Sequence, residues 1–246
     1  MEHNYWHEEE YKGFTLTLEQ DDNPIDPREW DNFSMMVTAH PRYLLGDYMV
    51  DGSGWVHKER KNESVPFYNT VESFTEWLKE QGKLGRVLFL PLYLYDHSGI
   101  SMRTGTFTPW PDYGGWDSGL VGYIYVTREQ IFKEFGWKGL TSKRKNKIFA
   151  ILQQEVMTYN DYLMGNVVGW QVWRGEPDES ELIESVWGYY GEDGRKQAIQ
   201  EAKDAIDWEI THEIKTNGQQ LILPDMEEYL PEEARLEKVR LETIGA

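Results

Sequence analysis

Residues 86–96, RVLFLPLYLYD, and residues 120–126, LVGYIYV, are the two densest apolar runs of the chain. Both runs are short, rich in residues that favour strands, and bounded by turn-forming residues, which is typical of buried β-strands. Pro91 interrupts the first run and favours a bulge or an edge position there, because proline has no backbone N–H to donate. The centre of the chain is therefore predicted to be a β-sheet.

Further strands are predicted on either side of this centre. Residues 13–20, GFTLTLEQ, alternate apolar and polar side chains, as a half-buried strand requires. Residues 167–173 and 181–191 are separated by the polar segment RGEPDE and favour a hairpin. We expect one mixed or antiparallel sheet that contains the strands at 86–96, 120–126, 167–173 and 183–190.

The longest predicted helix spans residues 142–164, where Thr141 or Ser142 can cap its start and Gly165 follows its end. Its apolar residues recur at the i, i+3, i+4, i+7 spacing of a packed face. Further helices are predicted over 69–81, 128–136 and 195–210. The sequence thus indicates an α+β fold in which the long helix covers the sheet. We expect a single domain over 1–210 and a peripheral acidic appendage over 211–246.

Charge is distributed unevenly along the 246 residues. Asp and Glu number 43 against 25 Lys and Arg, a formal net charge of −18. Residues 1–31 carry ten acidic side chains against two basic ones, and residues 176–209 carry eleven against three, whereas residues 58–147 carry ten against fourteen. This balance argues against general affinity for nucleic acid backbones or anionic membranes and favours a basic partner. The alternative is a solvated surface that improves solubility.

Several classes of site are excluded or disfavoured. The chain has no cysteine, which excludes disulfides, thiolate zinc sites and cysteine nucleophiles and favours a reducing cytoplasm. The start, MEHNYWHEEE, lacks the basic and apolar regions of a signal peptide, and no run approaches the roughly 20 apolar residues of a membrane span. Metal-binding histidine spacings, EF-hand spacing and nucleotide-binding glycine loops do not occur. We therefore expect neither a metal nor another cofactor, and a cytoplasmic location.

Polar residues follow the first apolar run and precede the second. Asp96, His97 and Ser98 end the first, and Asp117 and Ser118 precede the second. If the two strands are antiparallel neighbours, these groups meet at one edge of the sheet, so we expect His97 and Asp117 to approach each other. A carboxylate that orients an imidazole can form an acid–base pair, and Ser98 can act as nucleophile or hydrogen-bond donor. The alternative is that both segments are only tight turns.

Glu155 is a further candidate, because it lies within the apolar stripe of the long helix. A carboxylate that faces a core must be paired or have a perturbed pKa. Its candidate partners are Arg103, Arg128 and His40, and the alternative is that Glu155 lies at the edge of the stripe and reaches solvent.

Four stretches carry a family resemblance: NPIDPREWDNFSMMVTAHPRYLLGD, LPLYLYDHSGISM, WDSGLVGYIYV and VWGYYG. Together, over residues 14–210, they resemble an uncharacterised family common in tailed phages and conjugative plasmids. The resemblance implies a mobile-element accessory protein and carries no established activity. Ile25 and Asp26 lengthen a segment that is shorter in the family pattern. The motif positions that recur are Trp30, Asp31, Asn32, His40, Gly46, Asp47, His97, Ser98, Gly99, Trp116, Asp117, Ser118 and Gly119.

Two functions from different classes follow. The first is a phage or plasmid protein that binds and inhibits a host defence protein, such as a restriction or CRISPR enzyme, with carboxylates in place of DNA phosphates in a basic channel. Its predicted binding residues are Glu8, Glu9, Glu10, Glu179, Glu181, Glu184, Trp30, Asp31, Asn32 and Asp47. The alternative is a small-molecule-binding or hydrolytic enzyme with a strand-end pocket around His97 and Asp117. Its further catalytic candidates are Ser98, Ser118, Glu155 and His40. A continuous anionic face favours the first function, and a closed pocket favours the second.

Overall fold

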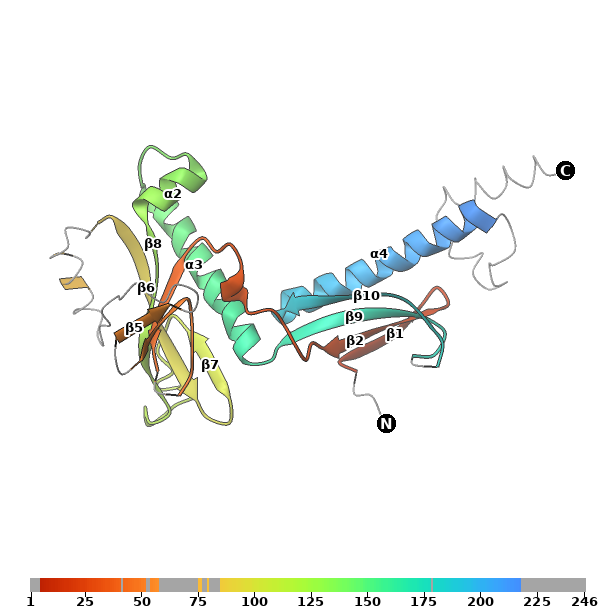
Figure 1. Cartoon of the computed structure of the whole chain (residues 1–246), viewed down its shortest axis with the longest axis horizontal. Coiled ribbons are helices and arrows are strands. Elements are labelled where there is room, and N and C mark those ends of the chain that lie inside the picture. Colours follow the sequence, from red (N-terminus) through yellow and green to blue (C-terminus); the bar gives the residue numbers. More distant parts are fainter. Residues whose placement is uncertain are drawn as a thin grey trace. The chain divides into compact units, whose positions relative to one another are not determined.

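The computed structural model describes residues 5–40, 42–51, 54–57, 75–76, 79, 85–177 and 179–217. The chain divides into two compact units (Figure 1). Unit 1 combines Met1–Pro24 with Gly165–Ala246, and unit 2 is Ile25–Met164. Strands and helices occur in both units, so the predicted α+β class is confirmed. The predicted helix over 69–81 lies largely outside the described residues.

Unit 2 is built on a six-stranded mixed sheet with the strand order β5-β4-β3-β8-β6-β7, in which β3 and β4 are parallel. Its strands are β3 Met35–Ala39, β4 Tyr48–Asp51, β5 Gly54–His57, β6 Val87–Asp96, β7 Ile100–Arg103 and β8 Ser118–Thr127. The two predicted apolar runs are β6 and β8, and they are antiparallel neighbours with a register shift between Leu92 and Tyr93, close to Pro91. The sequence predicted no element type for residues 33–50, which form β3 and part of β4.

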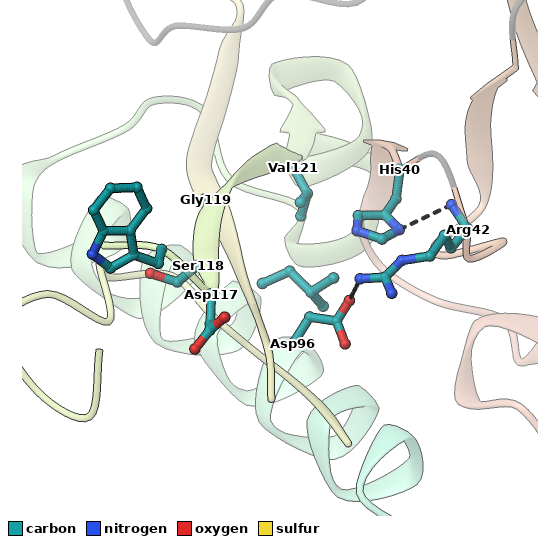
Figure 2. A pocket seen from close by; sticks show the side chains of 9 residues that line it. His40, Arg42, Asp96, Asp117, Ser118, Gly119 and Val121 are labelled. Carbon is teal, nitrogen blue, oxygen red and sulfur yellow. Dashed lines mark hydrogen bonds and ion pairs between the residues drawn. The ribbon is translucent and has the colours of Figure 1, made fainter. Parts of the chain in front are cut away.

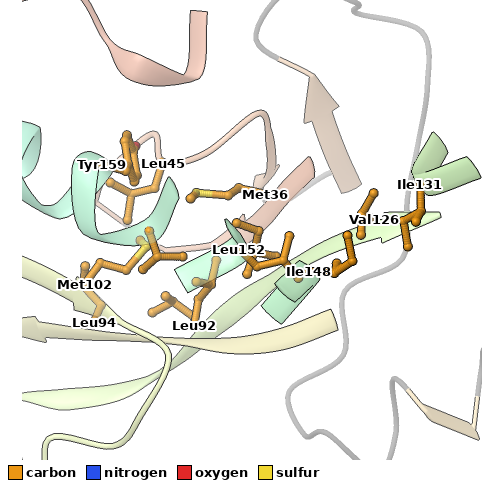
Figure 3. Packing of buried hydrophobic residues seen from close by; sticks show 13 residues of the cluster. Met36, Leu45, Leu92, Leu94, Met102, Val126, Ile131, Ile148, Leu152 and Tyr159 are labelled. Atoms are coloured by element: carbon orange, nitrogen blue, oxygen red, sulfur yellow. The ribbon is translucent and has the colours of Figure 1, made fainter. Parts of the chain in front are cut away.

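Helix α3, Ser142–Leu163, supplies the core of unit 2 and confirms the predicted long helix. The side chain of Thr141 accepts a hydrogen bond from the backbone N–H of Arg144 at 3.4 Å, as an N-cap does. The buried side chains of α3 recur every three or four residues and pack against those of β6 and β8 (Figure 3). They are Ile148, Leu152, Val156 and Tyr159, and they meet Leu92, Leu94 and Val126. The 3-10 helix η1, Pro27–Glu29, contacts α3, and α2, Arg128–Phe135, follows β8 as predicted.

In its described residues, unit 1 forms a four-stranded antiparallel sheet with one helix along one face (Figure 1). Its elements are β1 His7–Tyr11, β2 Phe14–Gln20, β9 Val167–Arg174, β10 Glu181–Tyr190 and α4 Gly191–Asn217. Alternate residues of β2 and β9 point toward α4, which presents a buried residue every four positions. This core contains Phe14, Leu16, Leu18, Val168, Trp170, Val172, Ala198, Ala202, Ile206 and Ile210.

The prediction that four strands share one sheet is wrong. β6 and β8 belong to the sheet of unit 2, whereas β9 and β10 belong to that of unit 1 and are covered by α4 instead of α3. The reason is that β9 pairs with β2, and the apolar pattern of a strand indicates its buried face without identifying its neighbour. The helix predicted over 195–210 is longer and continues to Asn217. The appendage predicted over 211–246 stays a prediction, because residues 218–246 lie outside the described ones.

Within the described part of the chain, no helix combines the length and the hydropathy that crossing a membrane requires.

Candidate functional site

An open cavity of about 260 Å³ lies in unit 2, where β6 ends and β8 begins (Figure 2). The antiparallel register places Tyr95 opposite Ser118, and the N–H of Asp96 donates to the carbonyl oxygen of Asp117 at 2.8 Å. Polar groups from three separate segments therefore converge at this edge of the sheet. The lining residues are His40, Arg42, Leu94, Asp96, Trp116, Asp117, Ser118, Gly119 and Val121.

The predicted approach of His97 and Asp117 is confirmed. The Nδ1 atom of His97 lies 3.0 Å from a carboxylate oxygen of Asp117, and both side chains are largely exposed. The ring of His97 also stacks on Tyr95 at a centroid distance of 5.9 Å. A carboxylate at Nδ1 orients the imidazole and leaves Nε2 as the atom that can exchange a proton with a ligand.

Asp112, which the sequence analysis missed, organises the loop before β8. Its carboxylate accepts hydrogen bonds from the N–H groups of Trp116 and Asp117, each at 3.1 Å, and from the hydroxyl of Ser118 at 2.7 Å. Burial alone would raise the pKa of Asp112, but these hydrogen bonds stabilise its charged form and hold the pKa below the ordinary value. Asp112 therefore fixes the position of Asp117.

Neither candidate serine is hydrogen-bonded to His97 in the part of the chain that the structure describes. The hydroxyl of Ser118 donates to the Asp112 carboxylate, so it is not activated by His97. Ser98 lies in the turn after β6 in the left-handed conformation, with φ of 56°. Among the described residues, therefore, no serine hydroxyl bonds to the His97 imidazole as a nucleophile activated by it would.

His40 and Asp96 occupy the other side of the cavity. The ring of His40 stacks on Tyr43 at 4.8 Å, and its Nδ1 accepts a hydrogen bond from the N–H of Arg42 at 3.3 Å. Burial lowers the pKa of His40, and the Asp96 carboxylate opposes this shift only in part. Asp96 forms an ion pair with Arg42 and accepts a hydrogen bond from the Tyr43 hydroxyl at 3.2 Å. These contacts favour a neutral imidazole beside a compensated ion pair.

Glu155 and Asp47 belong to a buried ion cluster instead of a site open to ligands. Arg28 donates to both oxygens of Asp47 at 3.0 and 2.6 Å, to Glu155 at 2.8 Å and to the carbonyl oxygen of Ser34 at 2.7 Å. The hydroxyl of Ser34 also donates to Glu155. The expected partners of Glu155 were wrong, because η1 brings Arg28 to α3 and the desolvated guanidinium takes both carboxylates. Asp47 is correspondingly unavailable as a surface binding residue.

The remaining residues of the first resemblance motif shape the loop after η1. The side-chain amide of Asn32 donates to the carbonyl oxygens of Pro27 and Trp30, at 2.8 and 2.9 Å. Trp30 and Asp31 are exposed. Gly46 donates its N–H to the hydroxyl of Tyr159 at 2.9 Å, which ties the loop before β4 to α3. Asn32 therefore acts on the backbone of its own loop.

The predicted acidic residues of β1 divide between the two faces of its sheet. Glu9 points toward α4 and pairs with Lys203 at 2.8 Å. Glu8 and Glu10 alternate with it, point away from α4 and are exposed. The outer strand β1 thus presents two carboxylates on the face without α4.

The acidic residues of β10 lie along the opposite outer strand of the sheet. Glu181 is exposed and pairs with Arg174 at 3.3 Å, and Glu184 is exposed and lies opposite the core residue Val172 in the register. Both therefore lie on the α4 side, and Glu179 is exposed in the preceding turn. The two predicted acidic clusters do not form one continuous face.

The net charge of the chain is concentrated in one unit. Unit 1 contains 26 Asp and Glu against nine Lys and Arg, a balance of −17. Unit 2 contains 17 against 16, a balance of −1. Nearly all of the net negative charge of the chain therefore belongs to unit 1, whereas the cavity lies in unit 2, which is nearly neutral.

Among the described residues, no group of three or more His, Asp or Glu side chains is arranged to hold a metal ion. Comparisons with protein-family models, with curated proteins and with solved structures give no match for this chain.

Proposed function

We propose that the chain is an accessory protein of the phage or plasmid type and that its acidic unit 1 binds and inhibits a basic, nucleic-acid-handling host protein. The observation that carries this proposal is the balance of −17 in unit 1 against −1 in unit 2. A solubility device would not need to confine the charge to one of the two units. A field of one sign on one unit steers that unit toward basic surfaces and raises the association rate.

The two predicted acidic clusters lie on opposite faces of the sheet, so unit 1 does not present the one continuous anionic face expected of DNA mimicry by charge alone. The contacts of the carboxylates indicate a different mode. Many acids of unit 1 are already paired, as Glu9 is with Lys203 and Asp207 is with Lys12 at 2.7 Å. Glu8 and Glu10 are exposed on β1 and have the freedom to accept hydrogen bonds from a partner. The overall charge then supplies attraction at a distance, and a smaller set of carboxylates supplies the contacts.

A second candidate function is the binding of a small polar molecule in the cavity of unit 2. The His97–Asp117 contact favours it, because Asp117 lines the cavity and holds next to it the imidazole of His97, which is not itself a lining residue but can exchange a proton with a ligand or with water. The engagement of Ser118 with Asp112 weighs against a hydrolase with a serine nucleophile. Binding or water-mediated proton transfer is the chemistry left to this site.

The test is capture of host proteins from a lysate on the immobilised full chain, followed by competition with double-stranded DNA. We expect basic nucleic-acid-binding proteins that DNA displaces and that elute at moderate salt. A variant in which four exposed acids of unit 1, Glu8, Glu10, Glu181 and Glu184, become Gln should capture less. The controls are two double variants compared with each other: Glu8→Gln with Glu10→Gln on unit 1, and Glu129→Gln with Glu134→Gln on α2 of unit 2, where both side chains are exposed. Each removes two charges, and only the first should capture less. Equal capture by the two double variants and the parent, or partners that DNA does not displace, would contradict the proposal.

A further inference from the structure

The sheet of unit 1 has a second face, which points away from α4 (Figure 1). We call it the distal face. Side chains alternate along each strand, so the residues between the core positions belong to it, and the register aligns them across the sheet. They are Glu8 and Glu10 on β1, Thr15, Thr17 and Glu19 on β2, Gly169, Gln171 and Trp173 on β9, and Leu182 and Ser185 on β10.

Trp187 adds an aromatic surface to the distal face. A Cβ atom at position 169 would lie 2.2 Å from a ring carbon of Trp187, so the indole lies directly over Gly169. Trp187 is 42% exposed and Leu182 is 44% exposed. This face therefore offers an indole ring and an aliphatic side chain to a partner.

Three polar atoms on the same face have no hydrogen-bond partner among the described residues. They are Oγ1 of Thr17, Oε1 of Gln171 and Nε1 of Trp173. Thr17 is 0% exposed and Trp173 is 8% exposed. Buried polar groups in folded proteins are almost always paired, so three unpaired atoms on one face are unusual, and a partner would pair them once the side chains that cover them shift. Thr17 lies opposite both Glu8 and Gln171 in the register, which joins these atoms to the acidic edge.

The chemistry of the distal face fits one kind of occupant. Carboxylates at Glu8 and Glu10 and the amide oxygen of Gln171 accept hydrogen bonds, and the Trp187 ring offers a π-face. Guanidinium groups match both features, one beside the carboxylates of β1 and another against the Trp187 ring over β9, because a guanidinium is planar, carries five donors and stacks on aromatic rings. The indole N–H of Trp173 is a donor and suits a backbone carbonyl of the same partner.

We propose that the distal face of unit 1 binds an arginine-bearing segment of the basic partner. This inference rests on the proposed function and names the surface and the residue type that the partner contributes. Lysine is the poorer occupant, since its ammonium is a compact, strongly hydrated charge without a planar face.

The test uses the full chain and two labelled peptides, nona-arginine and nona-lysine, with binding followed by fluorescence anisotropy. Both peptides carry the same charge, so general attraction acts on both. We expect nona-arginine to bind about tenfold more tightly, the scale of a desolvated cation–π contact with charge-assisted hydrogen bonds. The preference should fall in Glu8→Gln with Glu10→Gln and persist in Glu181→Gln with Glu184→Gln, which removes the same charge on the α4 side.

A second variant separates binding from folding. Gln171→Leu removes an unpaired buried oxygen, so its melting temperature should stay at or above that of the parent while the arginine preference falls. Equal affinity for the two peptides, or equal effects of the two double variants, would overturn the distal-face site and leave the proposed function standing. Failure of both peptides to bind would overturn both. A concentration-dependent dimer that Gln171→Leu abolishes would show that a second copy occupies the face, which also overturns the proposal.

Discussion

Replacing Arg28 should destabilise unit 2 more than any replacement of an exposed charge. The Arg28 side chain is 1% exposed and makes hydrogen bonds to Asp47, Glu155 and the carbonyl oxygen of Ser34. Arg28→Met keeps much of the volume but leaves two nearly buried carboxylates facing each other without a cation. Removing one partner of a buried ion pair costs about 3–5 kcal/mol, a large part of the roughly 5–15 kcal/mol that stabilises a domain.

Urea denaturation followed by tryptophan fluorescence measures this cost. With a denaturant slope of about 2 kcal/mol per molar, a loss of 3–5 kcal/mol lowers the midpoint of unit 2 by about 1.5–2.5 M. The matched control is Arg42→Met, because Arg42 also pairs with a carboxylate, that of Asp96, but is 66% exposed. An exposed pair contributes about 0–1 kcal/mol, so the control should shift the midpoint by no more than about 0.5 M. Equal shifts in the two variants would refute the cluster as a determinant of stability.

Three further predictions concern single side chains. Burial, assisted by the hydrogen bond to Glu201, raises the pKa of Tyr189 to about 12. The stability that the neutral phenol contributes is therefore complete below the ordinary pKa of 10.0 and is lost as pH rises toward 12. Tyr189→Phe should remove this alkaline loss from the free energy of unfolding, measured between about pH 9 and 12. Gly169→Ala should cost about 1–3 kcal/mol in urea denaturation, because its methyl group meets the Trp187 ring, and an unchanged midpoint would contradict this packing. His97→Ala should leave peptide affinity unchanged within about twofold, because the pair lies in the nearly neutral unit; a larger loss would transfer binding to the cavity.

Local sequence patterns predicted the helices and strands of this fold well. They did not predict which strands share a sheet, because that depends on pairing between distant segments. The Thr141 cap and the spacing of Ile148, Leu152 and Val156 are contained in a few consecutive turns, so α3 follows from them. The strand that pairs with β9 is β2, which lies near the start of the described chain. Nothing in the sequence of either strand indicates that the two pair. A strand that is apolar on one face fits any sheet that has a free edge and a helix to cover it.

The same distinction applies to the candidate site. His97 and Asp117 were predictable because they flank two adjacent antiparallel strands, so their approach needs only one local pairing. Arg28 meets carboxylates that lie 19 and 127 residues away along the chain, and sequence spacing carries no sign of such a contact. The unpaired atoms of Thr17 and Gln171 could not be predicted either. Both residues are ordinary in a half-exposed strand, and only the register shows that their polar atoms lie together without a partner.

The two kinds of carboxylate in unit 1 should affect different rate constants. A protein that replaced DNA by charge alone would need evenly spaced carboxylates over one surface, whereas Glu8 and Glu10 lie on the opposite face from Glu181 and Glu184. Exposed charges outside the contact act over a Debye length of about 8 Å and change the association rate and its dependence on salt. Groups that pair with a partner in a desolvated contact mainly slow dissociation. Charge removal on the α4 side should therefore slow association with nona-arginine, whereas removal on the distal face should also speed its dissociation.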